Sequence, residues 1–303
     1  MSPDDAGPDA ASAGSRWILA ARPHTLPAAV APVLVGTGVA IRDGAFRWDV
    51  LVITLAAALA IQVGVNFAND VADAAKGADT DSRIGPARAV ASGRIRPGEM
   101  WRAIGVVFGF ATLCGVYLTW VAGPVIIAIG VASLVAALGY TNGPLPYGYH
   151  GLGEVSVFVF FGLVATVGTR FAYDGSTGTG AWTGGVVMGL LAAAILVANN
   201  TRDLDTDRAA NKRTLAVMLG RSRARILYIV LMVSPFAVIA IAAAADGFSK
   251  WSLIALVVLP FTALPIKDVL TETSGPPLIK ALKTTGQIQL AVAIALLATI
   301  PMA

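Results

Sequence analysis

Long uncharged apolar runs alternate with short polar segments along almost the whole chain. A helix of about 20 apolar residues crosses the ~30 Å hydrocarbon core of a bilayer. By this length the pattern predicts nine transmembrane helices, at approximately residues 24–41, 49–70, 101–119, 122–141, 151–172, 181–203, 223–245, 251–269 and 284–302. Residues 1–15 contain neither an apolar run nor a basic stretch, so we expect a disordered tail before a single membrane domain over 16–303.

The composition supports an all-α polytopic membrane protein. Of the 303 residues 56% are hydrophobic and only 13% are charged, whereas a typical soluble domain carries about 25% charged residues. The net charge of +4 matters less than the placement of the basic residues among the short loops. We therefore expect the lipid bilayer as a partner and no nucleic acid.

The basic residues also predict an orientation. If the N-terminus is cytoplasmic, all but four of the 22 Lys and Arg residues fall in cytoplasmic segments; the exceptions are Arg42, Arg47, Arg170 and Lys250. Lys and Arg in short loops favour the cytoplasmic side. We therefore expect a protein of the cell membrane with its N-terminus inside and, for an odd number of spans, its C-terminus outside.

Two polar clusters stand at the ends of uncharged runs. The first follows residues 50–65 and contains Asn66, Asn69, Asp70 and Asp73, and the second follows residues 181–198 and contains Asn199, Asn200, Asp203 and Asp207. Residues three or four apart share one side of a helix, so each cluster is expected to form a polar patch. An ionised Asp deep in a membrane costs about 2.5–3.5 kcal/mol and is usually functional. Both clusters fall on the predicted cytoplasmic face, under the long segments 71–100 and 204–222, which we expect to cap a site.

The side chains in these clusters suit a metal ion and a phosphate. Carboxylate oxygens are preferred ligands of Mg²⁺, which usually shares one or two carboxylates with substrate phosphates. The chain also offers Asp79, Asp81 and Asp205 as further candidate ligands, and the basic residues nearby are Lys76, Arg83, Arg88, Arg94, Arg202, Arg208, Lys212 and Arg213. Lysine and arginine bind polyanions directly. Acids for metal and bases for phosphate at a membrane surface indicate a lipid diphosphate, although the same basic residues also serve orientation alone.

At these residues the chain resembles a known family. Asn69–Asp73 and Asp203–Asp207 are similar to the two aspartate-rich motifs of the UbiA superfamily of intramembrane prenyltransferases. The longer strings at 22–26, 66–79, 83–88, 140–149 and 199–215 resemble the subgroup that prenylates a dihydroxynaphthoate in menaquinone biosynthesis. Two positions depart from the general pattern: Gly77 replaces a third Asp of the first motif, and Asn211 replaces a Gly before Lys212. Asn tolerates the left-handed geometry of such a turn, so Lys212 keeps its expected role.

The resemblance implies a reaction and a set of residues. A polyprenyl group would pass from polyprenyl diphosphate to 1,4-dihydroxy-2-naphthoate, with loss of diphosphate and CO₂, giving demethylmenaquinone. Mg²⁺ would be held by Asp70, Asp73, Asp79, Asp203 and Asp207, while Lys76, Arg83, Arg88, Arg202 and Lys212 would stabilise the leaving diphosphate. Tyr140 would shield the allylic cation, and the substrates would be bound by Arg22, Asn66, Asn69, Tyr149, Asn199 and Asn200.

Two alternatives remain open at this level. A sister enzyme of the same family could act on 4-hydroxybenzoate, homogentisate or haem. An ion-coupled transporter could also carry intramembrane carboxylates, because internal repeats and buried acids are common in such carriers. The prenyl chain length and the oligomeric state do not follow from the sequence.

Overall fold

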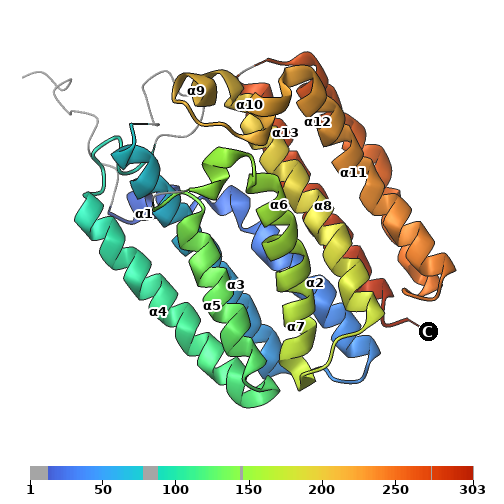
Figure 1. Cartoon of the computed structure of the whole chain (residues 1–303). Helices are drawn as coiled ribbons and strands as arrows, with labels where there is room; N and C mark the ends of the chain where they lie inside the picture. The colour runs from blue at the N-terminus through green and yellow to red at the C-terminus, as the bar shows by residue number, and fades with distance from the viewer. Residues whose placement is uncertain (1–12, 78–87, 144–145, 274, 303) are drawn as a thin grey trace, which may run out of the picture.

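Helices that mostly run side by side form the described structure, joined by short loops (Figure 1). The computed structural model describes residues 13–77, 88–143, 146–273 and 275–302, and within these ranges there is no β-strand. The first half of the chain forms α1 (Ala13–Ala21), η1 (Pro23–Thr25), α2 (Pro27–Arg42), α3 (Trp48–Ala75), α4 (Pro97–Ala122), α5 (Val125–Gly139) and η2 (Tyr147–His150). The second half forms α6 (Gly153–Val157), η3 (Phe158–Val164), α7 (Ala165–Asp174), α8 (Thr179–Arg202), α9 (Leu204–Ala209), α10 (Leu215–Leu219), α11 (Arg221–Ala244), η4 (Lys250–Thr262), α12 (Ala263–Thr271) and α13 (Pro276–Thr299).

The number of spans is smaller than predicted. Among the described residues seven helices are long and apolar enough to cross a membrane, and an eighth results if 14–25 and 27–42, bent by 51°, count as one span. The predicted helix 122–141 is the shorter α5 of 15 residues, which reaches only about 22 Å. Gly123 (φ 93°) and Pro124 separate it from α4. The all-α polytopic class is confirmed, and the count of nine is too high.

The helix boundaries follow from proline and glycine. Pro27, Pro97 and Pro276 each stand at the first helical position of α2, α4 and α13, where the missing N–H has no intrahelical partner to lose. Gly175 ends α7 with φ 77°, a left-handed conformation that glycine adopts without the steric cost of a side chain. The proline and glycine residues visible in the sequence therefore set where these helices begin and end.

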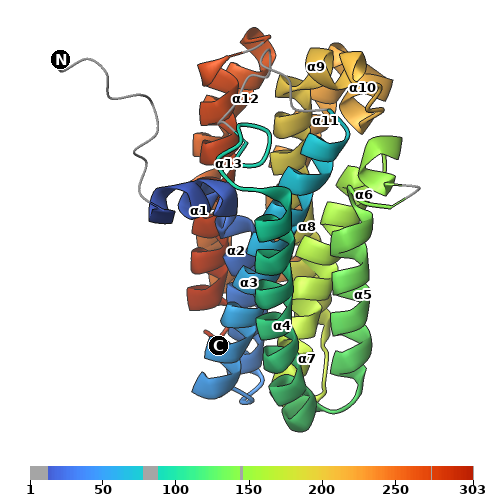
Figure 2. The ribbon, with the colours of Figure 1, turned by 90° about the vertical axis from the view of Figure 1, so that its left-hand side faces the viewer.

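The connections between the helices fall at two ends of the bundle. At the end drawn uppermost in Figure 1, here called the upper end, α9 and α10 cap the bundle, and the C-terminal ends of α3 and α8 arrive there. The loops at 43–47, 175–178 and 245–249 lie at the opposite, lower end (Figures 1 and 2). The two predicted polar clusters, on α3 and after α8, therefore lie at the same end of the molecule.

Helix α8 forms the centre of the core. It packs against α2, α6, α7, α11, α13 and η3. About two-thirds of the residues in its most apolar 18-residue stretch are buried. Its approach to η3 depends on small residues, because a methyl group on Gly162 would lie 2.4 Å from the Cα of Gly189. Small residues at helix interfaces let backbones approach closely in membranes. This packing holds α8, and the polar cluster at its end, in a fixed position.

The lower end carries an ionic cluster centred on the buried Arg170. Arg170 is 4% exposed, and it donates from Nε to Asp43 at 2.8 Å and from Nη1 to Asp174 at 2.7 Å. Arg42 donates to Asp43 at 3.2 Å and to the carbonyl of Gly247 at 2.9 Å. These bonds connect α2, α7 and the loop after α11. The cluster ties the helices together far from the polar clusters.

Candidate active site

The first cluster divides between two directions on α3. Asp70, 1% exposed, accepts hydrogen bonds from the backbone N–H groups of Ala89 at 3.1 Å and Val90 at 3.3 Å. Asn66 donates to the carbonyl of Ala21 at 2.8 Å and to the hydroxyl of Thr25 at 3.0 Å. Asn66 and Asp70 therefore fix the segments on either side of α3 that lead into the site.

The other half of this cluster faces the interior of the upper end. Asp73, 3% exposed, pairs with Arg88 at 3.2 Å and accepts a hydrogen bond from the Tyr149 hydroxyl at 2.5 Å. Asn69 accepts a hydrogen bond from the Thr141 hydroxyl at 2.8 Å, and Lys76 donates to the carbonyl of the same residue. Asn69, Asp73 and Lys76 therefore connect α3 to the segment that follows α5.

Burial and two neighbouring charges shift the pKa of Lys76. Burial lowers the pKa of Lys76, the carboxylate of Asp73 raises it, and the neighbouring cation of Lys212 lowers it, with a net lowering from 10.5. Two cations held close together repel each other and attract an anion. Lys76 and Lys212, from opposite halves of the chain, are placed to share one.

The second cluster is built around an ion pair between neighbouring residues. Arg202 donates from Nε and Nη2 to the two carboxylate oxygens of Asp203, at 2.7 and 2.5 Å, and from Nη2 to Asn199 at 2.9 Å. Arg202 and Asp203 are 6% and 5% exposed. Bidentate pairs of this kind fix the orientation of both groups. The end of α8 is thus held in one arrangement.

Asp207 and Lys212 form a short turn after α9. The Lys212 backbone N–H donates to the carbonyl of Asp207 at 2.8 Å, and Lys212 Nζ lies 3.8 Å from a carboxylate oxygen of Asp207. The turn passes through Asn211, whose φ of 55° lies in the left-handed region. Asparagine adopts this region more readily than most residues. The prediction that Asn211 takes the geometry of a glycine is confirmed.

Tyr149 joins the two clusters. Its hydroxyl donates to Asp73, and the ammonium groups of Lys76 and Lys212 lie 4.5 and 4.8 Å from the centre of its ring. Its carbonyl also accepts the backbone N–H of Arg213 at 3.1 Å. A cation within about 6 Å of an aromatic face is attracted by it. One side chain therefore brings residues from α3 and from the segment after α9 into contact.

Tyr140 lies where the two clusters meet. Burial raises the pKa of Tyr140 above its usual value, and Glu154, Tyr147, Asp73 and Asp207 add to the rise. Its ring packs edge to face with Tyr147 at 5.5 Å between centroids. The phenol of Tyr140 is therefore even less ready to ionise than an ordinary tyrosine. A neutral aromatic ring beside both clusters suits the predicted role of shielding a cation.

Arg22 and Asn200 approach the clusters from two further elements. Arg22 precedes η1 and has a φ of 52°. Its positive charge lies close enough to Asp70 to attract that carboxylate. Asn200 donates to Oε1 of Glu154 at 2.9 Å. Of the remaining predicted residues, Asp79, Asp81 and Arg83 lie outside the described part of the chain. The exposed Asp205 pairs with Arg221 at 2.8 Å.

The aspartates and asparagines of the two clusters offer oxygen ligands for a divalent cation. These ligands are carboxylates and amides without sulfur, which fits a hard cation such as Mg²⁺. Within the described residues, however, no three His, Cys, Asp or Glu side chains gather as a metal group. Asp73, Asp203 and Asp207 each lie beside a basic side chain instead. The chemistry of the residues fits Mg²⁺, and the two carboxylate clusters lie at one end of the bundle.

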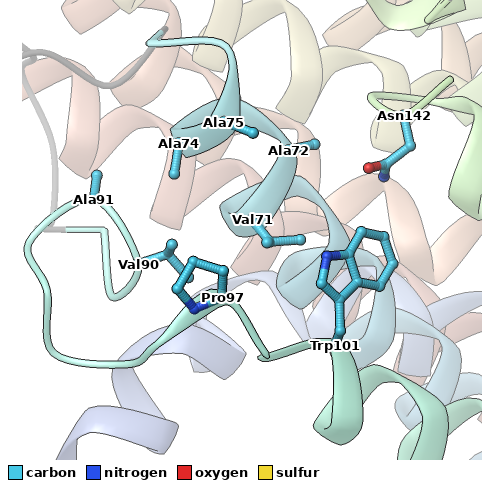
Figure 3. Close-up of a pocket in the computed structure, with 9 residues that line it drawn as sticks. All are labelled: Val71, Ala72, Ala74, Ala75, Val90, Ala91, Pro97, Trp101 and Asn142. Atoms are coloured by element: carbon cyan, nitrogen blue, oxygen red, sulfur yellow. The ribbon is translucent and has the colours of Figure 1, made fainter. Parts of the chain in front are cut away.

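A pocket opens beside α3 (Figure 3). It has a volume of about 370 Å³ and is lined by Val71, Ala72, Ala74, Ala75, Val90, Ala91, Pro97, Trp101 and Asn142. None of the predicted site residues lines it. The pocket therefore lies next to the first cluster without including its carboxylates.

Sequence reasoning missed Glu154 and Thr141. Thr141 carries no signal beyond a polar residue at a helix end. Glu154 had one, because it is the only acid at the start of the uncharged run 155–169, and an acid at membrane depth is a functional candidate by default. The structure places it against Asn200 of the second cluster.

The fold and the site together define a multi-pass membrane protein with one ionic site at the upper end of its helix bundle. The profile of the UbiA prenyltransferase family matches residues 29–274. The chain therefore belongs to the UbiA prenyltransferase family, and the resemblance found in the sequence is confirmed. An enzyme of prenyl transfer, and not an ion-coupled transporter, is the class that this family membership supports.

Relatives and solved structures agree with this assignment. The chain is 38% identical over 284 residues to 1,4-dihydroxy-2-naphthoate octaprenyltransferase of Mycobacterium tuberculosis, covering 93% of this chain and 95% of the relative. It is 35% identical over 262 residues to the Escherichia coli protein of the same name, covering 84% and 85%. A UbiA homolog from Archaeoglobus fulgidus, solved with DMAPP and Mg²⁺, has the same fold with a TM-score of 0.68 at 14% identity, covering 94% and 99%.

Proposed function

We propose that this protein transfers a polyprenyl group from polyprenyl diphosphate to 1,4-dihydroxy-2-naphthoate, releasing diphosphate and CO₂ and forming the quinol (reduced) form of demethylmenaquinone. The observation that carries the proposal is the contact of Tyr149 with Asp73, Lys76 and Lys212. It brings an acid and a base from the first motif together with Lys212, the lysine that follows the second motif. The relatives with the naphthoate activity in their names cover nearly the full chain, which supports this acceptor.

The basic residues would bind the diphosphate. Lys76 and Lys212 lie over the same aromatic ring, and Arg88 and Arg202 each pair with an aspartate of the site. As the allylic C–O bond breaks, negative charge grows on the diphosphate, and preorganised cations stabilise that charge more than they stabilise the substrate. Arg83 is proposed to join them.

The aspartates would hold Mg²⁺ against the diphosphate. We assign Asp70, Asp73, Asp203 and Asp207 to this role, and Asp79 with them. Bound Mg²⁺ would neutralise charge on the leaving diphosphate as a Lewis acid. The Archaeoglobus fulgidus UbiA homologs of the same fold, solved with Mg²⁺ and DMAPP or GPP, support this assignment.

The apolar surroundings would protect the carbocation. Tyr140 and Tyr147 pack together above the buried start of α6, and their rings would keep water from an allylic cation. Excluding water prevents hydrolysis of a reactive intermediate. Asn66, Asn69, Asn199, Asn200 and Arg22 are proposed to shape the substrate pocket. Asn199 accepts a hydrogen bond from Arg202, and the positive charge of Arg22 lies near Asp70. Asn66, Asn69 and Asn200 are held beside the clusters by hydrogen bonds to Thr25, Thr141 and Glu154.

The upper end is proposed to face the cytoplasm of a cell in whose plasma membrane the protein resides. The distribution of Lys and Arg in the sequence supports this orientation, because the positively charged segments gather at one end. The N-terminus would then be cytoplasmic and the C-terminus outside.

An acceptor panel tests the proposal. Purified protein in lipid nanodiscs is given one labelled polyprenyl diphosphate, Mg²⁺ and, separately, 1,4-dihydroxy-2-naphthoate, 4-hydroxybenzoate or homogentisate. We expect product only with the naphthoate, one CO₂ per product, and loss of activity in EDTA that Mg²⁺ restores. Product that retains the carboxyl group, or a preference for another acceptor, would overturn the naphthoate assignment. Absence of diphosphate release with every acceptor would overturn prenyl transfer itself.

A further inference from the structure

Glu154 is a buried acid with an unused oxygen. It stands at the start of α6, is 5% exposed, and accepts through Oε1 a hydrogen bond from Asn200 at 2.9 Å. No hydrogen-bond donor in the described part of the chain reaches Oε2, although that atom is buried. Leaving a buried acceptor without a partner costs about 1–3 kcal/mol, more for a charged group. Such a group in a native structure needs an explanation.

Each of the acids Asp70, Asp73 and Asp203 accepts at least two hydrogen bonds. Asp70 has two backbone N–H groups, Asp73 has Arg88 and Tyr149, and Asp203 has both nitrogens of Arg202. Glu154 instead accepts a hydrogen bond from a neutral amide, that of Asn200. Glu154 therefore has the capacity to accept one more hydrogen bond or a proton.

The position of Glu154 places this oxygen inside the site. Asn200, which holds Oε1, lies on α8 three residues before Asp203, the residue at which that helix ends. Tyr140 adjoins α6, because a methyl group on Gly153 would lie 2.9 Å from the Tyr140 hydroxyl. Glu154 thus stands between the second aspartate motif and the aromatic pair of Tyr140 and Tyr147.

The chemistry of the substrates decides what this oxygen can bind. The diphosphate and the carboxylate of the aromatic acceptor are anions, which a carboxylate repels. The acceptor hydroxyl is a neutral donor, and the ring carbon attacks more readily when that hydroxyl loses its proton. Side chains placed to accept such protons contribute about 10²–10⁴-fold to rates.

We propose that Glu154 is a catalytic residue whose Oε2 accepts the proton of a hydroxyl group on the aromatic acceptor. This inference rests on the proposed function. In the step, the acceptor O–H bond breaks and its proton moves to Oε2, while the electron pair stays on the acceptor oxygen and enters the ring. The allylic C–O bond breaks with its electron pair remaining on the diphosphate, and a ring carbon of the acceptor forms the C–C bond to the allylic carbon. The bond from the ring to the carboxylate then breaks and releases CO₂, its electron pair returns through the ring to the acceptor oxygen, and that oxygen takes back the proton from Oε2.

The test compares wild-type protein with E154Q across pH, under argon and with a reductant. Gln keeps the acceptor oxygen for Asn200 but cannot take a proton. We expect E154Q to lose about 10²–10³-fold in kcat at pH 7, with the KM for polyprenyl diphosphate changed by less than about twofold. The loss should shrink as the pH approaches about 10, the usual pKa of a phenol, because the acceptor then ionises without help.

Other titratable groups must be separated from Glu154. The elements packed against α6 carry Tyr147, Tyr149 and His150 on η2 and Arg202 with the adjoining Asp203 at the end of α8, and Tyr140 lies before η2. All of these are present in both wild type and E154Q. The effect of Glu154 is therefore measured by the ratio of the E154Q activity to the wild-type activity at each pH. The pH dependence of either protein alone does not isolate it.

E99Q is the matched control, because Glu99 caps α4 by accepting the backbone N–H of Arg96 at 3.3 Å. We expect wild-type activity from E99Q. If E154Q does not accumulate in membranes, E154D takes its place, and its smaller loss should also shrink with rising pH. A ratio to wild type that stays flat with pH, or E154Q within about threefold of wild type, would overturn the role of Glu154. Wild-type protein that transfers no prenyl group to any acceptor would overturn the proposed function instead.

Discussion

The hydroxyl of Tyr149 donates a hydrogen bond of 2.5 Å to Asp73, although the two residues lie 76 positions apart. The same ring faces Lys76 from the first half of the chain and Lys212 from the second. A change at Tyr149 therefore acts on both motifs at once, whereas a change at any one charged residue acts first on its own motif.

Replacing Tyr149 by Phe tests this connection. The ring and its contacts with the two lysines remain, but Asp73 loses a hydrogen bond to a charged group, worth about 1.5–3 kcal/mol. We expect kcat to fall about 10–100-fold, with a further fall in Y149A, as measured by steady-state prenyl transfer. Y117F is the control, because the Tyr117 hydroxyl makes the same kind of bond to Asp49 at the lower end. Equal losses in Y149F and Y117F would contradict the connection.

Much of the fold was predictable because long uncharged runs have few alternatives in a membrane. The predicted spans 49–70 and 181–203 correspond to α3 and α8. The predicted 122–141 failed as a full span because the apolar pattern runs on across Gly123 and Pro124, while helix α5 begins only at Val125 and ends at Gly139. Hydrophobicity reports where a chain is apolar, and backbone turns decide how long each helix is.

The site was less predictable than the fold. Helical spacing placed Asn66, Asn69, Asp70 and Asp73 together, yet Asp70 faces the segment 88–90 and Asp73 faces Tyr149. Spacing fixes which residues share a helix side and does not fix which partner each one meets. Glu154 was overlooked because its partner, Asn200, lies on another helix.

Asp203 and Asp205 should respond differently to the same substitution. Asp203→Asn removes one charge of a buried bidentate pair and leaves Arg202 uncompensated, which costs about 3–5 kcal/mol. We expect D203N to melt at a lower temperature and to lose prenyl transfer. Asp205 is 75% exposed in its pair with Arg221, so D205N should stay within about 0.5 kcal/mol of wild type. Inactive, well-folded D205N would instead place Asp205 in the metal site.

The lysines beside Tyr149 should govern binding of the diphosphate. K76M and K212M each remove one cation while keeping much of the aliphatic side chain. We expect the KM for polyprenyl diphosphate to rise about tenfold in either variant, since a close charge pair at a partly exposed site is worth about 1–2 kcal/mol. Lys267, on α12, is the control, and K267M should keep the wild-type KM. Unchanged KM in K76M and K212M would contradict their contact with the diphosphate.

The lower-end cluster makes stability depend on acid. Burial raises the pKa of Asp43, but the hydrogen bonds from Arg170 and Arg42 outweigh burial and leave it below 3.8. A carboxyl group with a lowered folded-state pKa contributes stability that is complete above about pH 4 and is lost as the pH falls through the lowered value. We therefore expect the melting temperature of wild-type protein to drop below pH 4.

R170A should weaken this dependence on acid, because Asp43 then keeps, among the described residues, Arg42 alone as an ionic partner. Since Asp43 and Asp174 are 27% and 40% exposed, we expect the loss at pH 7 to be about 1–3 kcal/mol. The cluster is remote from Tyr149, so kcat of the folded fraction should not change. If the melting temperature of R170A fell below pH 4 as steeply as that of the wild type, the lowered pKa of Asp43 would not depend on Arg170.

Packing of α8 against η3 provides a last prediction, concerning stability. A Cβ on Gly162 would lie 2.4 Å from the Cα of Gly189 and 2.6 Å from the carbonyl oxygen of Gly185, so backbones would have to move apart. Overpacking costs about 1–3 kcal/mol, and we expect G162A to reach the upper end of that range because no flexible side chain can yield. G168A on α7 is the matched control, since its Cβ would meet only Ile129 at 3.8 Å.

Helix propensity favours Ala over Gly by about 1 kcal/mol, so G168A should melt at or above the wild-type temperature. Thermal unfolding in detergent, followed by light scattering, measures both variants. Because α8 carries Asn200 and Arg202, we also expect G162A to lose prenyl transfer at temperatures where it is still folded. A G162A protein as stable and as active as G168A would mean that α8 does not depend on close contact with η3 for its position.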